Sequence, residues 1–474
     1  MTITRGAQCT ITATFCAVLG VVYAIAWRAP SFGLFHEDGT YLVAAESLAT
    51  GHMPSVTSLF PVVLAFLTAI SRSPLWLKLL PLLCTAAWLA LAWRLLRRMG
   101  AKTGGAWLLI LLTAASPTVI FLGTNLMSQP LFALLTTAAL LMLLDDRALF
   151  AGLLAGLATI TSSAGLPLVA ACMSILVIRR SFRRAAFFTA GAMLFVAPWL
   201  GWMLAKGAGG SFTSLALSEK LSVLGSNALS LLASPFELLS GVSSMYAIVA
   251  TALLLGWTLY RRRQLMPDLF LALYGLMLLC RVVPPRLMVA PILPLVFWIL
   301  WRVFQHARIQ EAVAAAALIA IAIPVFVDLA RIPETLRLGE FPSSARIPDD
   351  WNQLQPMFGY IRAHAAPNAV VLANLDSMFY LNTGRKTVRG FFPDGYKLYY
   401  AVSRPVVTPD QLGKEIIANG VGYVALTPDR DLPGSSAYRS AVEALERGGM
   451  LEPVAVPGVS RDYRLLRVVS LKAV

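Results

Sequence analysis

Eleven long apolar segments constrain this chain more than any other feature of its sequence. A transmembrane helix needs about 20 mostly apolar residues. The segments that meet or approach this length are 9–27, 75–96, 104–122, 127–144, 148–163, 165–179, 184–204, 242–260, 267–281, 286–303 and 311–330. Of the 474 residues, 58% are hydrophobic and only 13% are charged, whereas soluble proteins carry about 25% charged residues. The sequence therefore predicts an α-helical multi-pass membrane protein with about eleven spans.

The positive charges predict how these spans are oriented, because Lys and Arg collect in cytoplasmic loops. With the N-terminus inside, the cytoplasmic segments carry 15 Lys and Arg and the outer segments carry 7. An odd number of spans then places the loops 28–74 and 205–240, and all of 331–474, outside the membrane. Thr10–Trp27 is expected to be an uncleaved first span, since no small-x-small cleavage site precedes its end.

Residues 331–474 have the composition of a soluble domain, so we predict two domains, 1–330 in the membrane and 331–474 outside it. Helices and strands alternate in this second part, which predicts a small α/β domain. The expected helices are 350–364, 408–419 and 435–447, and the expected strands are 369–373, 421–426 and 463–469.

The net charge of +15 does not indicate nucleic-acid binding. Residues 331–474 carry 17 Lys and Arg against 14 Asp and Glu, so most of the excess lies in the short loops between spans. The five cysteines all fall in apolar segments without metal-ligand spacing, which predicts neither disulfides nor a zinc site.

Two adjacent carboxylates, Glu37 and Asp38, follow the first span directly. Carboxylates at a membrane exit are costly to desolvate, so their position needs an explanation. Either they belong to a solvated loop, with Asp38 capping a helix that starts near Thr40, or they form a catalytic pair at the membrane surface.

Several short motifs share their order along the chain with a known group of enzymes. They are Glu37-Asp38-Gly39-Thr40-Tyr41, Leu59-Phe60-Pro61-Val62, Ser116-Pro117, Ser128-Gln129, Thr161-Ser162, Pro284-Pro285-Arg286-Leu287 and Tyr380-Leu381-Asn382-Thr383-Gly384-Arg385. This order resembles the GT-C fold membrane glycosyltransferases, in particular the bacterial branch near the protein O-mannosyltransferases and the lipid A aminoarabinose transferases. The resemblance implies a protein of the bacterial inner membrane with its C-terminal domain in the periplasm. It also implies a polyprenyl-phosphate sugar donor and a key acidic residue in the first outer loop.

The motifs also depart from the family pattern. Glu37 stands where the family has Asp, and Asp38 stands where it has Glu. A Lys that often precedes the aromatic-Pro segment is missing, and Gln129 replaces an acidic residue.

Sugar transfer from a lipid phosphate needs a base for the acceptor and a cation for the leaving phosphate. Glu37 and Asp38 are the candidate catalytic pair, and a carboxylate beside a like charge can serve as a base near neutral pH. The two can ionise together in a dry site only if a cation compensates, so they are also candidate ligands of a divalent ion such as Mg²⁺ or Mn²⁺.

Arginines are the candidate ligands of the donor phosphate, because the guanidinium fork matches phosphate oxygens. Arg286 lies at the outer start of the tenth span and is the first candidate, and Arg281 lies nearby. The alternative for Arg281 is snorkelling to the interface. Tyr41 and Gln129 are candidate substrate-binding residues.

The leading hypothesis is a membrane glycosyltransferase, transferring a hexose or pentose from a polyprenyl-phosphate donor to an envelope lipid, glycan or protein. The alternative is a catalytically divergent GT-C-fold subunit or binding protein of an envelope polysaccharide pathway. A transporter is disfavoured, because the predicted spans hold almost no interior charge and show no internal repeat.

Overall fold

The chain divides into two compact units. The computed structural model describes residues 5–29, 36–49, 58–205, 215–240, 265–282, 286–304, 326–338, 350–389, 407–428 and 435–469. The helical unit comprises Met1–Arg28, Thr57–Ile332 and Ser343–Ala345, and the α/β unit comprises Ala29–Val56, Pro333–Pro342 and Arg346–Val474. The loop Ala29–Val56, which the sequence pattern assigned to the membrane part, thus groups with the C-terminal residues.

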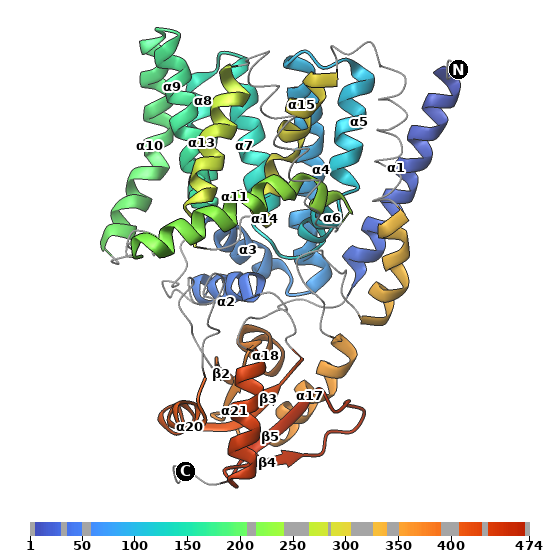
Figure 1. The fold of residues 1–474 in the computed structure, drawn as a ribbon, viewed down its shortest axis with the longest axis vertical. Helices are drawn as coiled ribbons and strands as arrows, with labels where there is room; N and C mark the ends of the chain where they lie inside the picture. The colour runs from blue at the N-terminus through green and yellow to red at the C-terminus, as the bar shows by residue number, and fades with distance from the viewer. Residues whose placement is uncertain are drawn as a thin grey trace. The chain divides into compact units, whose positions relative to one another are not determined.

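The helical unit contains a helix in every predicted span whose residues the structure describes (Figure 1). Its elements are α1 (Arg5–Arg28), α3 (Leu59–Ile70), α4 (Pro74–Arg98), α5 (Thr103–Ala114), α6 (Pro117–Thr124), α7 (Gln129–Leu144), α8 (Ala148–Thr161), η1 (Ser163–Gly165), α9 (Leu166–Ile178), α10 (Phe182–Ala205), α11 (Leu217–Ser240), α13 (Leu265–Leu279), α14 (Arg286–Val289), η2 (Ala290–Ile292) and α15 (Leu293–Phe304). The predicted span 242–260 and most of 311–330 lie outside the described residues.

Two of the described helices, α4 and α10, are long and apolar enough to cross a membrane by themselves. A third crossing results if α5 and α6 form one span, which is bent by 67° at its break. The break coincides with Ser116-Pro117, where the proline ring disfavours a helical conformation of the preceding residue. The eleven-span count therefore stays a prediction.

Close backbone contact joins α8 to α10. A Cβ atom added to Gly152 would lie 2.1 Å from the carbonyl oxygen of Phe188, and one added to Gly156 would lie 2.7 Å from that of Ala192. Gly191 on α10 approaches the carbonyl oxygen of Leu149 in the same way. This is the small-residue packing that lets membrane helices approach closely without a hydrophobic driving force.

Ion pairs join helix ends in the segments that the charge pattern places in the cytoplasm. Asp145 accepts from both Arg94 and Arg98, at 3.3 and 2.9 Å. The buried guanidinium of Arg302 lies 2.5 Å from Asp268 and ties the end of α15 to the start of α13.

The α/β unit is a three-layer structure around a five-stranded sheet of order β2-β1-β3-β5-β4. Its elements are α2 (His36–Ala49), α17 (Trp351–His364), β1 (Val370–Ala373), α18 (Asp376–Thr383), β2 (Lys386–Val388), α20 (Pro409–Ala418), β3 (Val421–Leu426), α21 (Ser435–Arg447), β4 (Leu451–Val454) and β5 (Arg464–Val468). Strands β2, β1 and β3 are parallel, and β5 runs antiparallel to both β3 and β4.

Successive side chains along each strand point to opposite faces of the sheet, which produces two hydrophobic cores, one on each face. Val371 and Ala373 pack against α17 and α18, whereas Val370 and Leu372 pack against α20 and α21. Among the described residues after 331, helices and strands occur where the sequence pattern predicted them, and α18, β2 and β4 are additional. The two-domain division at residue 330 stays a prediction.

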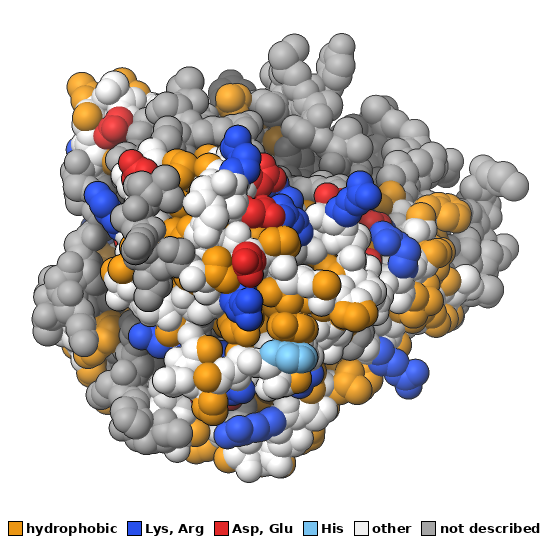
Figure 2. Space-filling model, turned by 90° about the horizontal axis from the view of Figure 1, so that it is seen from below, with side chains coloured by type: hydrophobic (Ala, Val, Ile, Leu, Met, Phe, Trp, Pro, Cys, Tyr) orange, Lys and Arg blue, Asp and Glu red, His pale blue; other side chains and the backbone are white. Residues whose placement is uncertain are grey.

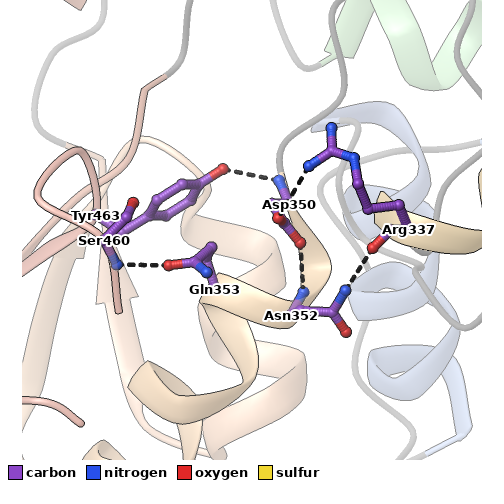
Figure 3. A network of polar contacts seen from close by, with 6 residues as sticks. All are labelled: Arg337, Asp350, Asn352, Gln353, Ser460 and Tyr463. Carbon is purple, nitrogen blue, oxygen red and sulfur yellow. Dashed lines mark hydrogen bonds and ion pairs between the residues drawn. The ribbon is translucent and has the colours of Figure 1, made fainter. Parts of the chain in front are cut away.

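Polar contacts fix the start of α17 beside the entry to β5 (Figure 3). The Tyr463 hydroxyl accepts a hydrogen bond from the backbone N–H of Asp350 at 2.7 Å, and the Asp350 carboxylate caps the helix at Asn352. Gln353 accepts from the backbone of Ser460 at 2.5 Å. These bonds join segments more than 100 residues apart in the sequence.

Candidate functional site

The predicted acidic pair lies in the first turn of α2 rather than in a loop. The helix begins at His36, so Asp38 is inside it and is not the cap of a helix starting near Thr40. That alternative was wrong because the helix starts four residues earlier than the sequence pattern indicated. The side chains of Glu37 and Asp38 lie outside the described part of the structure. A helix N-terminus carries a partial positive charge and stabilises carboxylates placed in its first turn.

Tyr41 is on the same helix, one turn further along, and is half-buried. Helix α2 belongs to the α/β unit and packs there against α18. Helix α18 ends with the Tyr380–Arg385 motif, and Gly384 provides the expected turn with a φ of +66°. The structure therefore brings the first and the last of the sequence motifs onto two packed helices.

Arg281 is the second residue after the end of α13 and is half-buried. The buried side chain of Asn227, on α11, donates hydrogen bonds to the carbonyl oxygens of Leu278, Leu279 and Arg281, at 3.2, 3.0 and 2.8 Å. The last carbonyl groups of a helix lack their usual donors within the helix. Here the side-chain amide of Asn227, a residue remote in sequence, donates to carbonyl oxygens at this end. Asn227 thereby fixes the backbone that carries Arg281, although the sequence pattern gave no indication of this role.

Arg286 is the first residue of α14, and its side chain lies outside the described part of the structure. The hydroxyl of Tyr274 on α13 donates to the carbonyl oxygen of Met288 at 2.7 Å. The Tyr274 ring stacks on Phe132 of α7, with centroids 6.3 Å apart. Helix α11 packs against both α13 and α14 and runs across the direction of the bundle helices (Figure 1). The end of α13, near Arg281, is therefore held by Asn227 of α11, and the segment after Arg286 is held by Tyr274 of α13.

Gln129 begins α7 and is 3% exposed. It lines a cavity of about 10 Å³ together with Trp88 of α4 and with Ala290 and Pro291 of η2. A cavity of this size holds about one water molecule. Gln129 thus lies against the segment that follows Arg286, as a shared substrate site would require, but this cavity is too small for a sugar.

A hydrogen bond between distant segments links two further sequence motifs. The hydroxyl of Ser58, which caps α3, donates to the carbonyl oxygen of Thr161 at 2.9 Å. The aromatic-Pro segment at Phe60 and Pro61 thus begins beside Thr161-Ser162. Both Phe60 and Pro61 are buried, so they act as packing residues of the helical unit.

No three His, Cys, Asp or Glu side chains gather as metal ligands among the described residues. The two carboxylates proposed as ligands belong to the part of α2 whose side chains are not described. Divalent-ion binding by Glu37 and Asp38 therefore stays a prediction, and no reaction step is assigned to a metal.

Charge on the described part of the face drawn in Figure 2 is mixed in sign. Lys and Arg side chains lie beside Asp and Glu side chains there. Among the described residues, Arg467 and Glu452 form an exposed pair of opposite charge.

Comparisons with known proteins define the fold. No protein family matches the chain by sequence, and no curated protein does. Among solved structures, the chain is similar to ArnT from Cupriavidus metallidurans bound to undecaprenyl phosphate, with a TM-score of 0.59 and 14% identity over 97% of this chain and 98% of ArnT. The apo state of ArnT gives a TM-score of 0.57 at 12% identity over the same shares of the two chains.

A third similar structure is the arabinofuranosyltransferase AftD from Mycobacteria, with a TM-score of 0.47 and 15% identity over 99% of this chain and 42% of AftD. ArnT has the GT-C fold, and its likeness extends over nearly the whole length of both chains. The GT-C fold expected from the sequence motifs is therefore confirmed.

Proposed function

We propose that this protein is an integral-membrane glycosyltransferase that moves a sugar from a polyprenyl-phosphate donor to an envelope acceptor on the outer face of the membrane. The observation that carries the proposal is the likeness to ArnT along 97% of the chain, because that structure binds undecaprenyl phosphate. A lipid-phosphate ligand in turn requires a cation near the membrane surface, and Arg281 and Arg286 meet this need.

In the proposed reaction, the acceptor oxygen or nitrogen forms a bond to the anomeric carbon of the donor sugar. The bond from that carbon to the phosphate oxygen breaks, and polyprenyl phosphate leaves with the electron pair. Glu37 or Asp38 takes the proton of the acceptor, and Arg286 with Arg281 stabilises the charge on the leaving phosphate. Tyr41 and Gln129 are proposed to bind the substrates, and the transferred sugar is a hexose or a pentose.

The clamped position of Arg281 supports its part in this proposal. Three hydrogen bonds from Asn227 hold the backbone at the end of α13, so less conformational freedom is lost when phosphate binds. The departure of the phosphate also requires hydrogen-bond donors that are already in place where the negative charge of the phosphate develops.

Lipid binding by the purified protein in nanodiscs tests the first half of the proposal. Arg281→Ala and Arg286→Ala are each expected to weaken binding of undecaprenyl phosphate at least tenfold, as measured by native mass spectrometry. Arg147→Ala is the matched control, because that exposed arginine lies at the start of α8, in a segment predicted to be cytoplasmic. Equal binding by all three variants would contradict the phosphate site.

Transfer from a radiolabelled polyprenyl-phosphate sugar to membrane acceptors tests the second half. Glu37→Ala and Asp38→Ala are expected to keep lipid binding and to lose most of the transfer.

The divergent-subunit alternative is favoured by the missing Lys and by Gln129 in place of an acid. It predicts lipid binding without transfer even in the unaltered protein, so the two assays together separate the hypotheses.

A further inference from the structure

The three parallel strands of the α/β unit all lead into polar side chains at the same edge of the sheet. Asn374 follows β1, Arg389 follows β2, and Thr427 follows β3. The register pairs Ala373 with Ala425, so Asn374 and Thr427 lie within two residues of the last paired positions. We refer to Asn374, Asp376, Arg389 and Thr427 as the switch-point residues.

The topology makes this edge a favoured place for a ligand. Helix α18, which follows β1, covers one face of the sheet, and α21, which follows β3, covers the other. Since β1 and β3 are neighbours, the chain leaves them toward opposite faces. In open α/β sheets, ligands bind outside the carboxyl ends of strands at such a switch point.

One buried hydroxyl group at this edge has no partner among the residues that the structure describes. Asn374 and Thr427 are each 4% exposed. The Thr427 hydroxyl is buried and has no hydrogen-bond partner in the described part of the chain, although buried hydroxyl groups are almost always paired. The Thr427 backbone is held in place, because Arg439 donates to its carbonyl oxygen at 3.2 Å and to that of Asp462 at 2.9 Å.

The charges at this edge indicate a neutral ligand. The guanidinium of Arg389 lies 2.9 Å from the carboxylate of Asp376, and the two charges compensate each other. Thr387 donates to the Asp376 carbonyl oxygen at 2.8 Å and fixes the start of α18. The Thr427 hydroxyl can both donate and accept, and it lies at the same edge as a compensated ion pair, which suits a ligand whose own groups are hydroxyls.

We propose that the switch-point residues of the α/β unit form a binding site for a neutral saccharide. The site uses none of the residues assigned to sugar transfer, so it does not depend on the proposed reaction. An anionic ligand is not expected to bind here, because it would require an uncompensated cation at this edge.

Saturation-transfer-difference NMR on the full-length protein in nanodiscs tests the proposal, with D-glucose, D-mannose, D-galactose and their disaccharides as probes and empty nanodiscs as the blank. At least one neutral sugar is expected to receive saturation, and inorganic phosphate is expected not to displace it. Thr427→Val is expected to weaken this binding at least tenfold while leaving the melting temperature unchanged, since the lost hydroxyl bonds to none of the described residues.

Thr383→Val is the matched control. Thr383 is also a buried threonine, but it lies at the far end of α18. Its hydroxyl donates to the Phe379 carbonyl oxygen at 2.6 Å and accepts from the backbone N–H of Arg385 at 3.2 Å. This variant is expected to bind the sugar normally. Asn374→Ala is a second test of the site. No sugar binding, binding that phosphate displaces, or equal binding by Thr427→Val and the unaltered protein would each overturn the proposal.

Discussion

Asn227 illustrates which single residues a sequence can and cannot reveal. Arg281 was a candidate from the sequence because it lies close to Arg286, whose Pro-Pro-Arg motif resembles that of the family. Asn227 lies in a Ser-rich stretch without such a motif, and its three partners are 51 to 54 residues away. Thr427 is a second example, because the lack of a partner for its hydroxyl can be recognised only when the surrounding residues are placed.

Asn227→Ala removes a side-chain donor from three carbonyl oxygens at and just after the end of α13. The Leu278 oxygen keeps the backbone N–H of Arg281, whereas those of Leu279 and Arg281 lose the Asn227 amide. An unsatisfied buried polar group costs about 1–3 kcal/mol, so a lower melting temperature and at least tenfold weaker binding of undecaprenyl phosphate are expected. Thermal denaturation and native mass spectrometry measure the two effects. In the control Asn419→Ala, the lost amide bonded only to Glu415 of the same exposed helix end, and lipid binding should be unchanged. Normal lipid binding by Asn227→Ala would contradict the positioning role.

At the scale of elements, strong local patterns predicted most of the α/β unit, and weak ones did not. Strand β3 was predicted at its observed bounds, because a short apolar run stands between turn residues. Strand β2 has only three residues, and β4 contains Pro453 at the edge of the sheet, where proline is tolerated. Helix α18 has eight residues, which is too short to show a clear helical period of apolar residues. These elements form because neighbouring strands and helices complete their hydrogen bonds and burial.

The contact between α8 and α10 allows a test at this scale. Gly152→Ala places a methyl group against the backbone of Phe188, and overpacking of this kind costs about 1–3 kcal/mol. We expect a lower melting temperature and a lower yield of monodisperse protein. Gly201→Ala on α10 is the matched control, because nothing lies within 4 Å of the added methyl group. If both variants melt at the same temperature, close packing at Gly152 does not stabilise the pair.

For the whole molecule, the charge pattern makes a prediction about orientation that the fold alone does not provide. An odd number of spans places α11 and the α/β unit outside and the loop before α5 inside. Single cysteines at Lys220, Arg461 and Lys102 in a cysteine-free background sample these three places. A membrane-impermeant maleimide added to intact spheroplasts is expected to label Lys220→Cys and Arg461→Cys, and to label Lys102→Cys only after permeabilisation. Protection of Arg461→Cys together with labelling of Lys220→Cys would mean that the number of spans between them differs from the prediction.

The sequence by itself determined the properties that depend on neighbouring residues. Apolar runs specify helices, the loop charges predict their direction, and the motif order indicated the GT-C fold that the likeness to ArnT confirms. Only the tertiary structure decided that Ala29–Val56 groups with the C-terminal residues, that Asn227 holds the end of α13, and that Gln129 lies beside Pro291. These facts depend on contacts between segments far apart in the chain. Hydrogen bonding and burial then select one pairing among many that are locally acceptable, and no local pattern records that choice.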